Sequence, residues 1–309
     1  MLRGYMNLRL PSAGVTPPLV TPLLAPDQLD VDGFGRLIDR CIAGGVAGLF
    51  VLGTTGEGPS LSHPLKREVV SQCCRITAGR VPVLVGLIEA SIDDALRLAG
   101  HAAERRADAL VWTPPFYYPL SQDLVIAAAE RLIPKLPLPV YLYNIPVFTK
   151  VPFEPETLAR LAALPGVCGI KDSGGDLTKL ARTRALLPEI PILWGPEEIQ
   201  LDAMRAGATG GVNGGANLFP ELFVGLDAAI VGGDAERARL LQALVKRISD
   251  EIYAAAPGGP GFVYGIKCAL EDLGVCGSLP AEPLGPLTGA AREQIRRATA
   301  SIAESVRGL

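Results

Sequence analysis

The chain has 309 residues, of which 49% are hydrophobic and 20% are charged, so it is long and apolar enough to bury a large core. Its formal net charge of -3 supplies no basic surface for nucleic acid, and no nucleic-acid partner is expected. No apolar run approaches the roughly 18 residues that span a bilayer, and prolines interrupt residues 1–18, where a signal peptide needs an apolar stretch, so we expect a cytoplasmic protein without a membrane partner.

Short apolar, β-branched runs recur along the chain, and each predicts a strand. These runs are residues 15–23, 48–52, 81–86, 109–113, 139–143, 167–171, 191–194 and 210–213. Segments with helical spacing of apolar residues lie between them, at 31–43, 64–78, 92–105, 124–133, 155–164, 177–187 and 198–206. This repeated alternation of strand and helix predicts a parallel (β/α)8 TIM barrel.

An open doubly wound sheet has the same alternation, but such a sheet usually carries a glycine-rich phosphate turn after its first strand. The first strand here ends in Pro17-Pro18-Leu19-Val20-Thr21-Pro22, which is not such a turn. Three further helical segments, 226–256, 262–273 and 289–306, exceed what barrel closure needs. We therefore expect an N-terminal extension over 1–14 and a catalytic barrel over 15–225. The last barrel helix and a C-terminal helical extension are expected over 226–309.

The cysteines and histidines do not form an obvious zinc set. The six cysteines include no C-x-x-C pair, and there are only two histidines. Cys168 lies three residues before Lys171, but its place inside a predicted strand and the lack of a nearby histidine favour packing over nucleophilic chemistry. We expect no metal and no cofactor.

Lys171 ends the sixth predicted strand, where the ordinary interpretation is a solvated surface lysine. In a barrel of this kind, however, the ends of the strands and the loops after them build the active site. A desolvated amine loses its proton more readily and attacks carbonyl groups. Tyr143 ends the fifth predicted strand, and the spacing of neighbouring strands places it about 5 Å from Lys171. We therefore predict a Schiff-base nucleophile, Lys171, with Tyr143 as its proton carrier.

Two other strand ends are polar or aromatic. After the second strand, Gly53-Thr54-Thr55-Gly56-Glu57-Gly58 offers a tight turn whose amides and hydroxyls suit the carboxylate of a small keto acid, although a plain loop with capping threonines has the same composition. After the fourth strand, residues 112–119 are rich in proline and aromatic residues. This second segment either lines the site or packs against another subunit.

Taken in order, the motifs at the strand ends resemble those of the N-acetylneuraminate lyase and dihydrodipicolinate synthase family, the pyruvate-dependent class I aldolases. The resemblance covers nearly the whole chain from about residue 17 and rests on Gly53-Thr-Thr-Gly-Glu57, Phe116-Tyr-Tyr-Pro119, Tyr143-Asn-Ile-Pro146, Gly169-Ile-Lys-Asp-Ser173 and Gly210-Gly-Val-Asn-Gly214. It implies that Lys171 forms an imine with pyruvate and that Tyr143 shuttles the proton.

The same resemblance implies roles for residues around this pair. Thr54 and Thr55 would bind the keto-acid carboxylate and link to Tyr143. Ser173 and Gly195, beside the sixth and seventh strand ends, are added to the substrate-binding set. Tyr117 would be donated across a dimer contact, and members of the family are usually tetramers built from two tight dimers. We therefore expect a homotetramer.

Substrate choice depends on positions where the chain departs from one branch of the family. Dihydrodipicolinate synthases that resemble this chain carry an arginine soon after the Y-N-x-P motif, and Phe148 at the matching position cannot supply a bidentate fork. Glu197 and Glu198 resemble acidic residues of the lyase branch that bind hydroxyl groups, although both glutamates also suit the first turn of the next helix. Gly214 replaces a serine usual in sialic-acid enzymes, and Asn213 is expected to supply part of that contact.

We therefore predict a lyase that reversibly cleaves a 2-oxo-3-deoxy sugar acid, or a related 4-hydroxy-2-oxo acid, into pyruvate and an aldehyde. Within the family, the alternative is dihydrodipicolinate synthase (4-hydroxy-tetrahydrodipicolinate synthase), which condenses pyruvate with aspartate semialdehyde. An alternative of another class is a non-catalytic barrel that only binds pyruvate, since a fold alone does not guarantee turnover.

Overall fold

The computed structural model describes residues 10–256 and 260–308, so the expected N-terminal extension over 1–14 lies mostly outside the described residues. The main sheet consists of β1 (Gly14–Val15), β4 (Leu49–Val51), β5 (Val83–Leu87), β6 (Ala109–Trp112), β7 (Val140–Asn144), β8 (Val167–Asp172), β9 (Ile192–Trp194) and β10 (Gly210–Gly211). Its order is β1-β10-β9-β8-β7-β6-β5-β4, and each neighbouring pair is parallel. A small antiparallel hairpin, β2 (Leu23–Ala25) and β3 (Gln28–Leu29), precedes the first helix.

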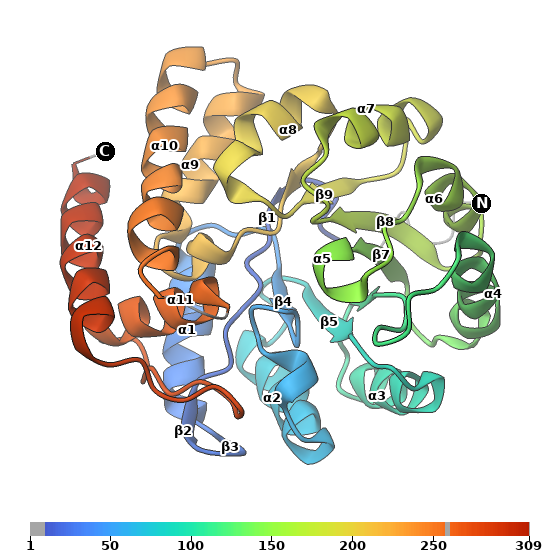
Figure 1. Cartoon of the computed structure of the whole chain (residues 1–309), viewed down its shortest axis with the longest axis horizontal. Helices are drawn as coiled ribbons and strands as arrows, with labels where there is room; N and C mark the ends of the chain where they lie inside the picture. Colours follow the sequence, from blue (N-terminus) through green and yellow to red (C-terminus); the bar gives the residue numbers. More distant parts are fainter. Residues whose placement is uncertain (1–9, 257–259, 309) are drawn as a thin grey trace.

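The segment after β1 closes the sheet against β4. The Leu19 amide donates to the Phe50 carbonyl at 2.8 Å, and the Phe50 amide donates to the Pro17 carbonyl at 3.0 Å. The predicted (β/α)8 TIM barrel is thereby confirmed (Figure 1). The predicted first strand, 15–23, was too long, because the prolines at 17, 18 and 22 have no N–H to donate to a strand ladder.

Helices alternate with the strands and surround them (Figure 1). They are α1 (Val31–Ala43), α2 (His63–Thr77), α3 (Ile92–Glu104), α4 (Gln122–Leu132), α6 (Pro155–Ala162), α7 (Leu177–Leu186) and α8 (Gln200–Ala206). The side chains of Asp30, Ser62, Ser91, Ser121 and Asp176 cap α1, α2, α3, α4 and α7 at their N-termini. The short α5 (Pro146–Thr149) and the 3-10 turns η2 (Gly58–Ser60), η3 (Ile133–Lys135), η4 (Glu197–Ile199) and η5 (Gly214–Asn217) lie in the connections.

The C-terminal part contains α9 (Pro220–Val231), α10 (Ala235–Arg247), the π-helical η6 (Ile248–Tyr253), α11 (Gly261–Asp272) and α12 (Gly289–Arg307). The prediction of a single helical segment over 226–256 was wrong. Gly233, with φ at 76°, helps to end α9, and Asp234 caps α10. The expected boundary between 225 and 226 falls inside α9. Figure 1 shows α12 outside α10, and both α11 and α12 contact η6. Within the described residues, no helix combines the length and the apolar character needed to cross a membrane.

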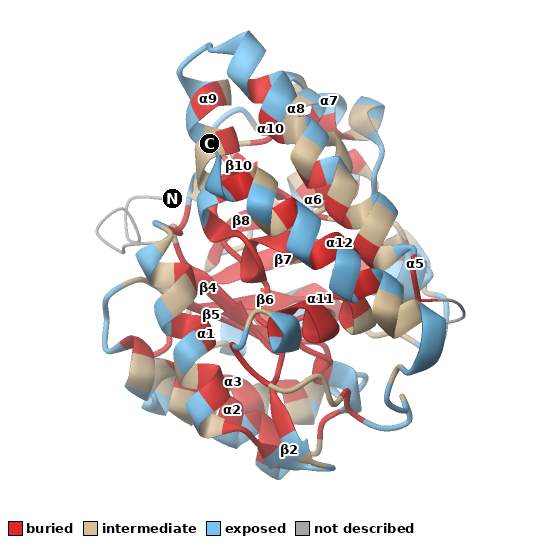
Figure 2. Ribbon diagram, turned by 90° about the vertical axis from the view of Figure 1, so that its left-hand side faces the viewer, coloured by how far each residue is buried: buried red, intermediate tan, exposed pale blue. Residues whose placement is uncertain are grey.

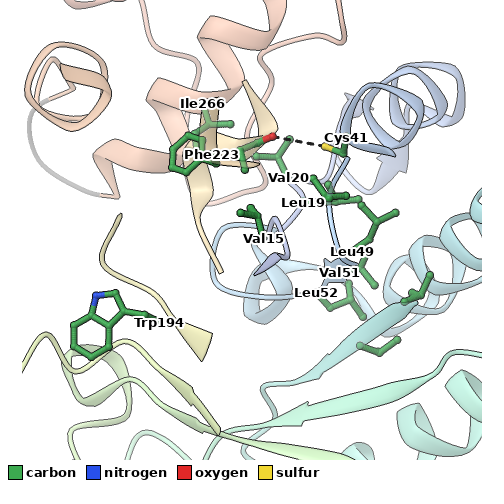
Figure 3. Close-up of a cluster of buried hydrophobic side chains, with 14 of the residues drawn as sticks. Val15, Leu19, Val20, Cys41, Leu49, Val51, Leu52, Trp194, Phe223 and Ile266 are labelled. Atoms are coloured by element: carbon green, nitrogen blue, oxygen red, sulfur yellow. Dashed lines mark hydrogen bonds between the residues drawn. The ribbon is translucent and has the colours of Figure 1, made fainter. Parts of the chain in front are cut away.

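Alternation along each strand separates two apolar clusters. Inside the barrel, β7 contributes Tyr141 and Tyr143, as their spacing predicted, while Leu142 faces the helices. Gly169 on β8 leaves room for the Tyr141 ring, because a Cβ there would collide with it. Figure 2 shows buried strands enclosed by helices with exposed outer faces. The close-up in Figure 3 shows part of the other cluster, which lies between the strands and the surrounding helices. There the Cys41 Sγ donates to the Ala216 carbonyl at 3.8 Å.

Candidate active site

Lys171 and Tyr143 lie side by side inside the barrel. They are register partners on β8 and β7, and each is at least 95% buried, with exposed fractions of 5% and 2%. The Lys171 Nζ lies 3.4 Å from the centre of the Tyr143 ring and 3.4 Å from the Ser173 Oγ. The predicted neighbourhood of the two side chains is present in the structure.

The amine of Lys171 is poorly solvated. Burial holds its pKa well below the usual 10.5, and the nearby Asp172 carboxylate only partly opposes this shift. Asp172 is directed elsewhere, because its Oδ1 accepts hydrogen bonds from the Asn144 Nδ2 and the Gly174 amide, both at 2.8 Å. The lowered pKa increases the share of the neutral, nucleophilic amine relative to an exposed lysine.

The turn after β4 brings a threonine to the phenol of Tyr143. The Thr54 Oγ1 lies 3.3 Å from the Tyr143 OH. Burial raises the pKa of Tyr143 to about 12, while hydrogen bonds from Thr54 and Ser173 act in the opposite direction. In the described part of the chain, the amides of Thr54 and Thr55 donate to no backbone acceptor. The turn therefore presents free donors beside a protonated phenol.

These residues open onto a cavity of about 570 Å³ at the carboxyl ends of the strands. Its lining includes the predicted residues Thr54, Thr55, Tyr143, Lys171, Ser173, Gly195 and Glu197, as well as Phe148, Glu198, Gly214, Ser249, Tyr253, Phe262 and Ile266. The cavity thus has an imine end, around Lys171 and Tyr143, and a second end formed by η4 and the C-terminal helices. We call this second part the tail end, defined by Glu197, Glu198, Ser249 and Tyr253.

Glu197 organises the tail end. Its Oε1 accepts a hydrogen bond from the Tyr253 OH at 2.9 Å, and its Oε2 accepts one from the Gly215 amide at 3.0 Å. Burial, assisted by the neighbouring Glu198, raises the pKa of Glu197 to about 8. Glu198 in turn accepts a hydrogen bond from the Ser249 hydroxyl. Both glutamates begin the short helix η4 and also line the cavity.

Two predicted site residues lie away from the cavity within this chain. Asn213 is buried, and its side-chain amide donates to the Gln200 Oε1 at 3.2 Å, so it lines neither end. Its predicted substrate contact is not supported, since its amide is used to join β10 to α8. Tyr117 is 71% exposed and has an unusual φ of 88°, with its ring edge-on to Tyr118 at 5.0 Å between centroids. Cys168 is buried, and burial raises the pKa of its thiol to about 12, as a packing role requires.

The sequence did not indicate the contributions of the C-terminal part to the cavity. Ser249 and Tyr253 come from η6, and Phe262 and Ile266 come from α11. None of these residues belongs to a strand end, so the rule that led to Lys171 does not find them. The only local signal is the spacing of Ser249 and Tyr253, four residues apart on one helical face, and that pattern is common in helices without a site.

A model of the dihydrodipicolinate synthetase family matches residues 11–302. A 4-hydroxy-tetrahydrodipicolinate synthase of Hyphomonas neptunium is 36% identical over 290 residues, covering 93% of this chain and 97% of the relative.

Solved structures give the same result. The dihydrodipicolinate synthase of Bacteroides thetaiotaomicron has 45% identity and a TM-score of 0.92, covering 96% of this chain and 100% of that one. YagE, a prophage protein of Escherichia coli K12 solved in complex with pyruvate, has 27% identity and a TM-score of 0.88, covering 94% and 98%. The family resemblance predicted from the strand-end motifs is confirmed.

Proposed function

The chain belongs to the dihydrodipicolinate synthetase family and is a lyase, and from this we propose that it is a Schiff-base-forming class I aldolase. Its proposed substrate is a 2-oxo-3-deoxy sugar acid, or a related 4-hydroxy-2-oxo acid, which it cleaves reversibly to pyruvate and an aldehyde. The proposal has two halves, one for each end of the cavity.

At the imine end, Lys171 is proposed to bind the 2-oxo acid covalently. Its neutral amine attacks the ketone carbon, and loss of water with uptake of one proton gives a protonated imine. The amides of Thr54 and Thr55 and the Thr55 hydroxyl suit the substrate carboxylate. The related YagE protein was solved in complex with pyruvate, which supports an oxo acid as the ligand.

Cleavage then needs a proton to leave the 4-hydroxyl group. We assign this transfer to Tyr143, whose neutral phenol accepts the 4-hydroxyl proton while it passes its own proton to the Thr54 hydroxyl and onward through the cavity. The bond between C3 and C4 breaks, its electron pair becomes the C2–C3 double bond of an enamine as the π pair of the imine moves to nitrogen, and the aldehyde is released. Protonation of C3 and hydrolysis of the imine by water return pyruvate and free Lys171.

The lining of the tail end carries the choice of substrate. Apart from Lys171, no lysine or arginine lines the cavity in the described part of the chain. Phe148 stands where a guanidinium would be needed for a second carboxylate, and it offers only an aromatic ring. By contrast, Glu197, Glu198 and Tyr253 provide polar oxygens that suit the hydroxyl groups of an uncharged tail.

A second candidate is 4-hydroxy-tetrahydrodipicolinate synthase, because the Hyphomonas relative carries that name. Its second substrate, aspartate semialdehyde, has a carboxylate, and the described residues of the tail end include no lysine or arginine to bind it. A non-catalytic pyruvate-binding protein is disfavoured by the close placement of Lys171 and Tyr143.

We also propose that the enzyme is a homotetramer built from dimers. The support is the exposed, strained Tyr117, which the family resemblance places across a dimer contact. Light scattering in solution tests this state directly. A strict monomer with full activity would contradict it.

The imine is tested by incubating the protein with pyruvate and borohydride and locating the reduced adduct by mass spectrometry. We expect the adduct on Lys171, and its absence would overturn the proposed chemistry. Pyruvate release from a panel of 2-oxo-3-deoxy acids is then compared with condensation of pyruvate and aspartate semialdehyde. Faster condensation would favour the synthase over the sugar-acid lyase.

A further inference from the structure

A buried ion pair joins the C-terminal helices to the turn that carries Thr54 and Thr55. The Lys267 side chain on α11 is fully buried, and its Nζ contacts the Glu57 carboxylate. The other Glu57 oxygen accepts a hydrogen bond from the Ala281 amide at 2.6 Å, while the Lys267 Nζ also donates to the Leu279 carbonyl at 2.8 Å. The turn after β4, α11 and the segment that follows α11 therefore meet at this pair.

Glu57 has a strained backbone within the catalytic turn. Its φ is 57°, in the left-handed region that residues other than glycine rarely adopt. Its amide donates to the Thr54 carbonyl at 3.1 Å, and the Gly58 amide donates to the Gly53 carbonyl at 3.1 Å. Any displacement of the Glu57 side chain therefore acts on the turn that places the Thr54 hydroxyl beside Tyr143.

The helix that supplies the lysine also reaches the reaction cavity. Phe262 and Ile266 of α11 line the cavity, and Lys267 is the next residue along the helix. Burial lowers the pKa of Lys267, and Glu57 opposes this shift. A buried ion pair contributes little net stability compared with apolar residues of the same size, whereas loss of one partner leaves the other charge uncompensated. A role in positioning the turn therefore explains the pair better than a contribution to stability.

We propose that Glu57 and Lys267 are positioning residues for the reaction at Lys171. The pair holds the turn after β4 so that the Thr54 hydroxyl stays within reach of the Tyr143 phenol and the amides of Thr54 and Thr55 face the substrate carboxylate. The C-terminal helices thus act on the imine end as well as on the tail end. This inference rests on the proposed function, because it concerns the binding and proton transfer of a 2-oxo acid.

The test uses exchange of the pyruvate methyl protons with deuterated water, which needs imine formation and proton transfer but no aldehyde. For Lys267→Met we expect the half-saturating pyruvate concentration to rise about tenfold and the maximal exchange rate to fall about tenfold. Each change corresponds to the loss of about one charge-assisted hydrogen bond, in carboxylate binding and in proton transfer respectively. Borohydride still traps Lys171 at saturating pyruvate. Glu57→Gln behaves similarly, and the double variant Glu57→Gln/Lys267→Met recovers part of both losses because no charge remains unpaired.

Lys66→Met is the matched control. It breaks another buried ion pair, in which the Lys66 Nζ lies 2.6 Å from the Glu89 Oε1, and neither residue lines the reaction cavity. We expect a lower melting temperature for this variant and unchanged exchange at temperatures where it is folded. Unchanged exchange in Lys267→Met, or an equal loss in Lys66→Met, would overturn the positioning role alone. Absence of exchange in the wild type would overturn the proposed function as well.

Discussion

The two ends of the cavity are built in different ways. At the imine end, Lys171 and Tyr143 are register partners on neighbouring strands, held by the ladder between β7 and β8. At the tail end, Glu197 begins a short helix after β9, and it meets Tyr253 from η6, 56 residues later in the chain. The proposed nucleophile and proton carrier are therefore held by the sheet, while the contacts at the tail end depend on how the C-terminal helices pack.

This difference separates chemistry from substrate choice. Strands are rigid supports, so nucleophile and proton carrier keep their geometry when loops change. Loops and added helices tolerate substitution, and the residues they carry determine which aldehyde fits. If this division holds, changes at the imine end reduce turnover of every substrate, and changes at the tail end affect only substrates with a tail.

The largest effect is expected for Lys171→Met. Without the amine, no imine forms, and turnover falls by at least about a thousandfold, as for loss of a covalent nucleophile. Borohydride trapping followed by mass spectrometry should show no adduct. Lys179→Met is the control, because Lys179 is partly exposed and pairs with Glu154 at 2.8 Å outside the cavity. Activity lost equally in both variants would contradict the assignment.

Tyr143→Phe comes next, and it tests the two steps at the imine end separately. The amine still attacks pyruvate, so the trapped adduct on Lys171 persists, whereas turnover drops by about 10²-fold to 10⁴-fold because the proton carrier is lost. Tyr141→Phe is a close control, since Tyr141 lies on the same face of β7 but donates to the Pro11 carbonyl at 2.9 Å. Retention of full turnover by Tyr143→Phe would refute its role.

The sequence predicted the imine end well because its determinants are local. Strand periodicity gives the face on which Tyr143 and Lys171 lie, and the barrel rule gives the end at which they meet. The motif Gly53-Thr-Thr-Gly-Glu57 likewise predicted a tight turn. Its main-chain geometry agrees: a Cβ on Gly56 would lie 2.7 Å from the Leu19 carbonyl oxygen.

The tail end was predicted only in part, because its determinants are tertiary. Glu197 was identified from its place after a strand, but its partner Tyr253 could not be, since nothing in the sequence pairs a residue of η6 with one of η4. For the same reason, the contact between Glu57 and Lys267 was not foreseen. Asn213 shows the opposite failure, because its position at a strand end suggested the site while its side chain turns toward Gln200.

Tyr253→Phe is expected to have a moderate effect confined to the tail end. It removes the hydrogen bond to the Glu197 Oε1, and loss of one such bond lowers kcat/KM for a 2-oxo-3-deoxy acid by about tenfold. Deuterium exchange into pyruvate should change by less than about twofold, since the imine end is intact. Tyr264→Phe, in α11 but outside the cavity lining, serves as the control. If Tyr253→Phe reduced the cleavage and exchange reactions equally, the two ends of the cavity would not act separately.

The last prediction concerns the dependence of stability on pH. Because burial raises the pKa of Glu197 from 4.5 to about 8, the folded state holds a proton that the unfolded state releases between these values. Stability from this group is therefore complete below about pH 4.5 and is lost as the pH rises through about 8. Glu197→Gln lacks this titration, so its free energy of unfolding should rise relative to wild type by up to about 1.4 kcal/mol per pH unit within that window.

Urea unfolding of both proteins at pH 5, 6.5 and 8 measures this difference, because groups common to the two chains cancel. A difference that stays constant with pH would mean that Glu197 is already ionised in the folded protein. In that case the tail end would hold a fixed negative charge, and Glu197 would meet the hydroxyl groups of the substrate tail as an acceptor only. A difference that grows with pH instead gives Glu197 a proton at neutral pH, so that this one carboxyl group can act as both donor and acceptor toward a hydroxyl of the substrate tail.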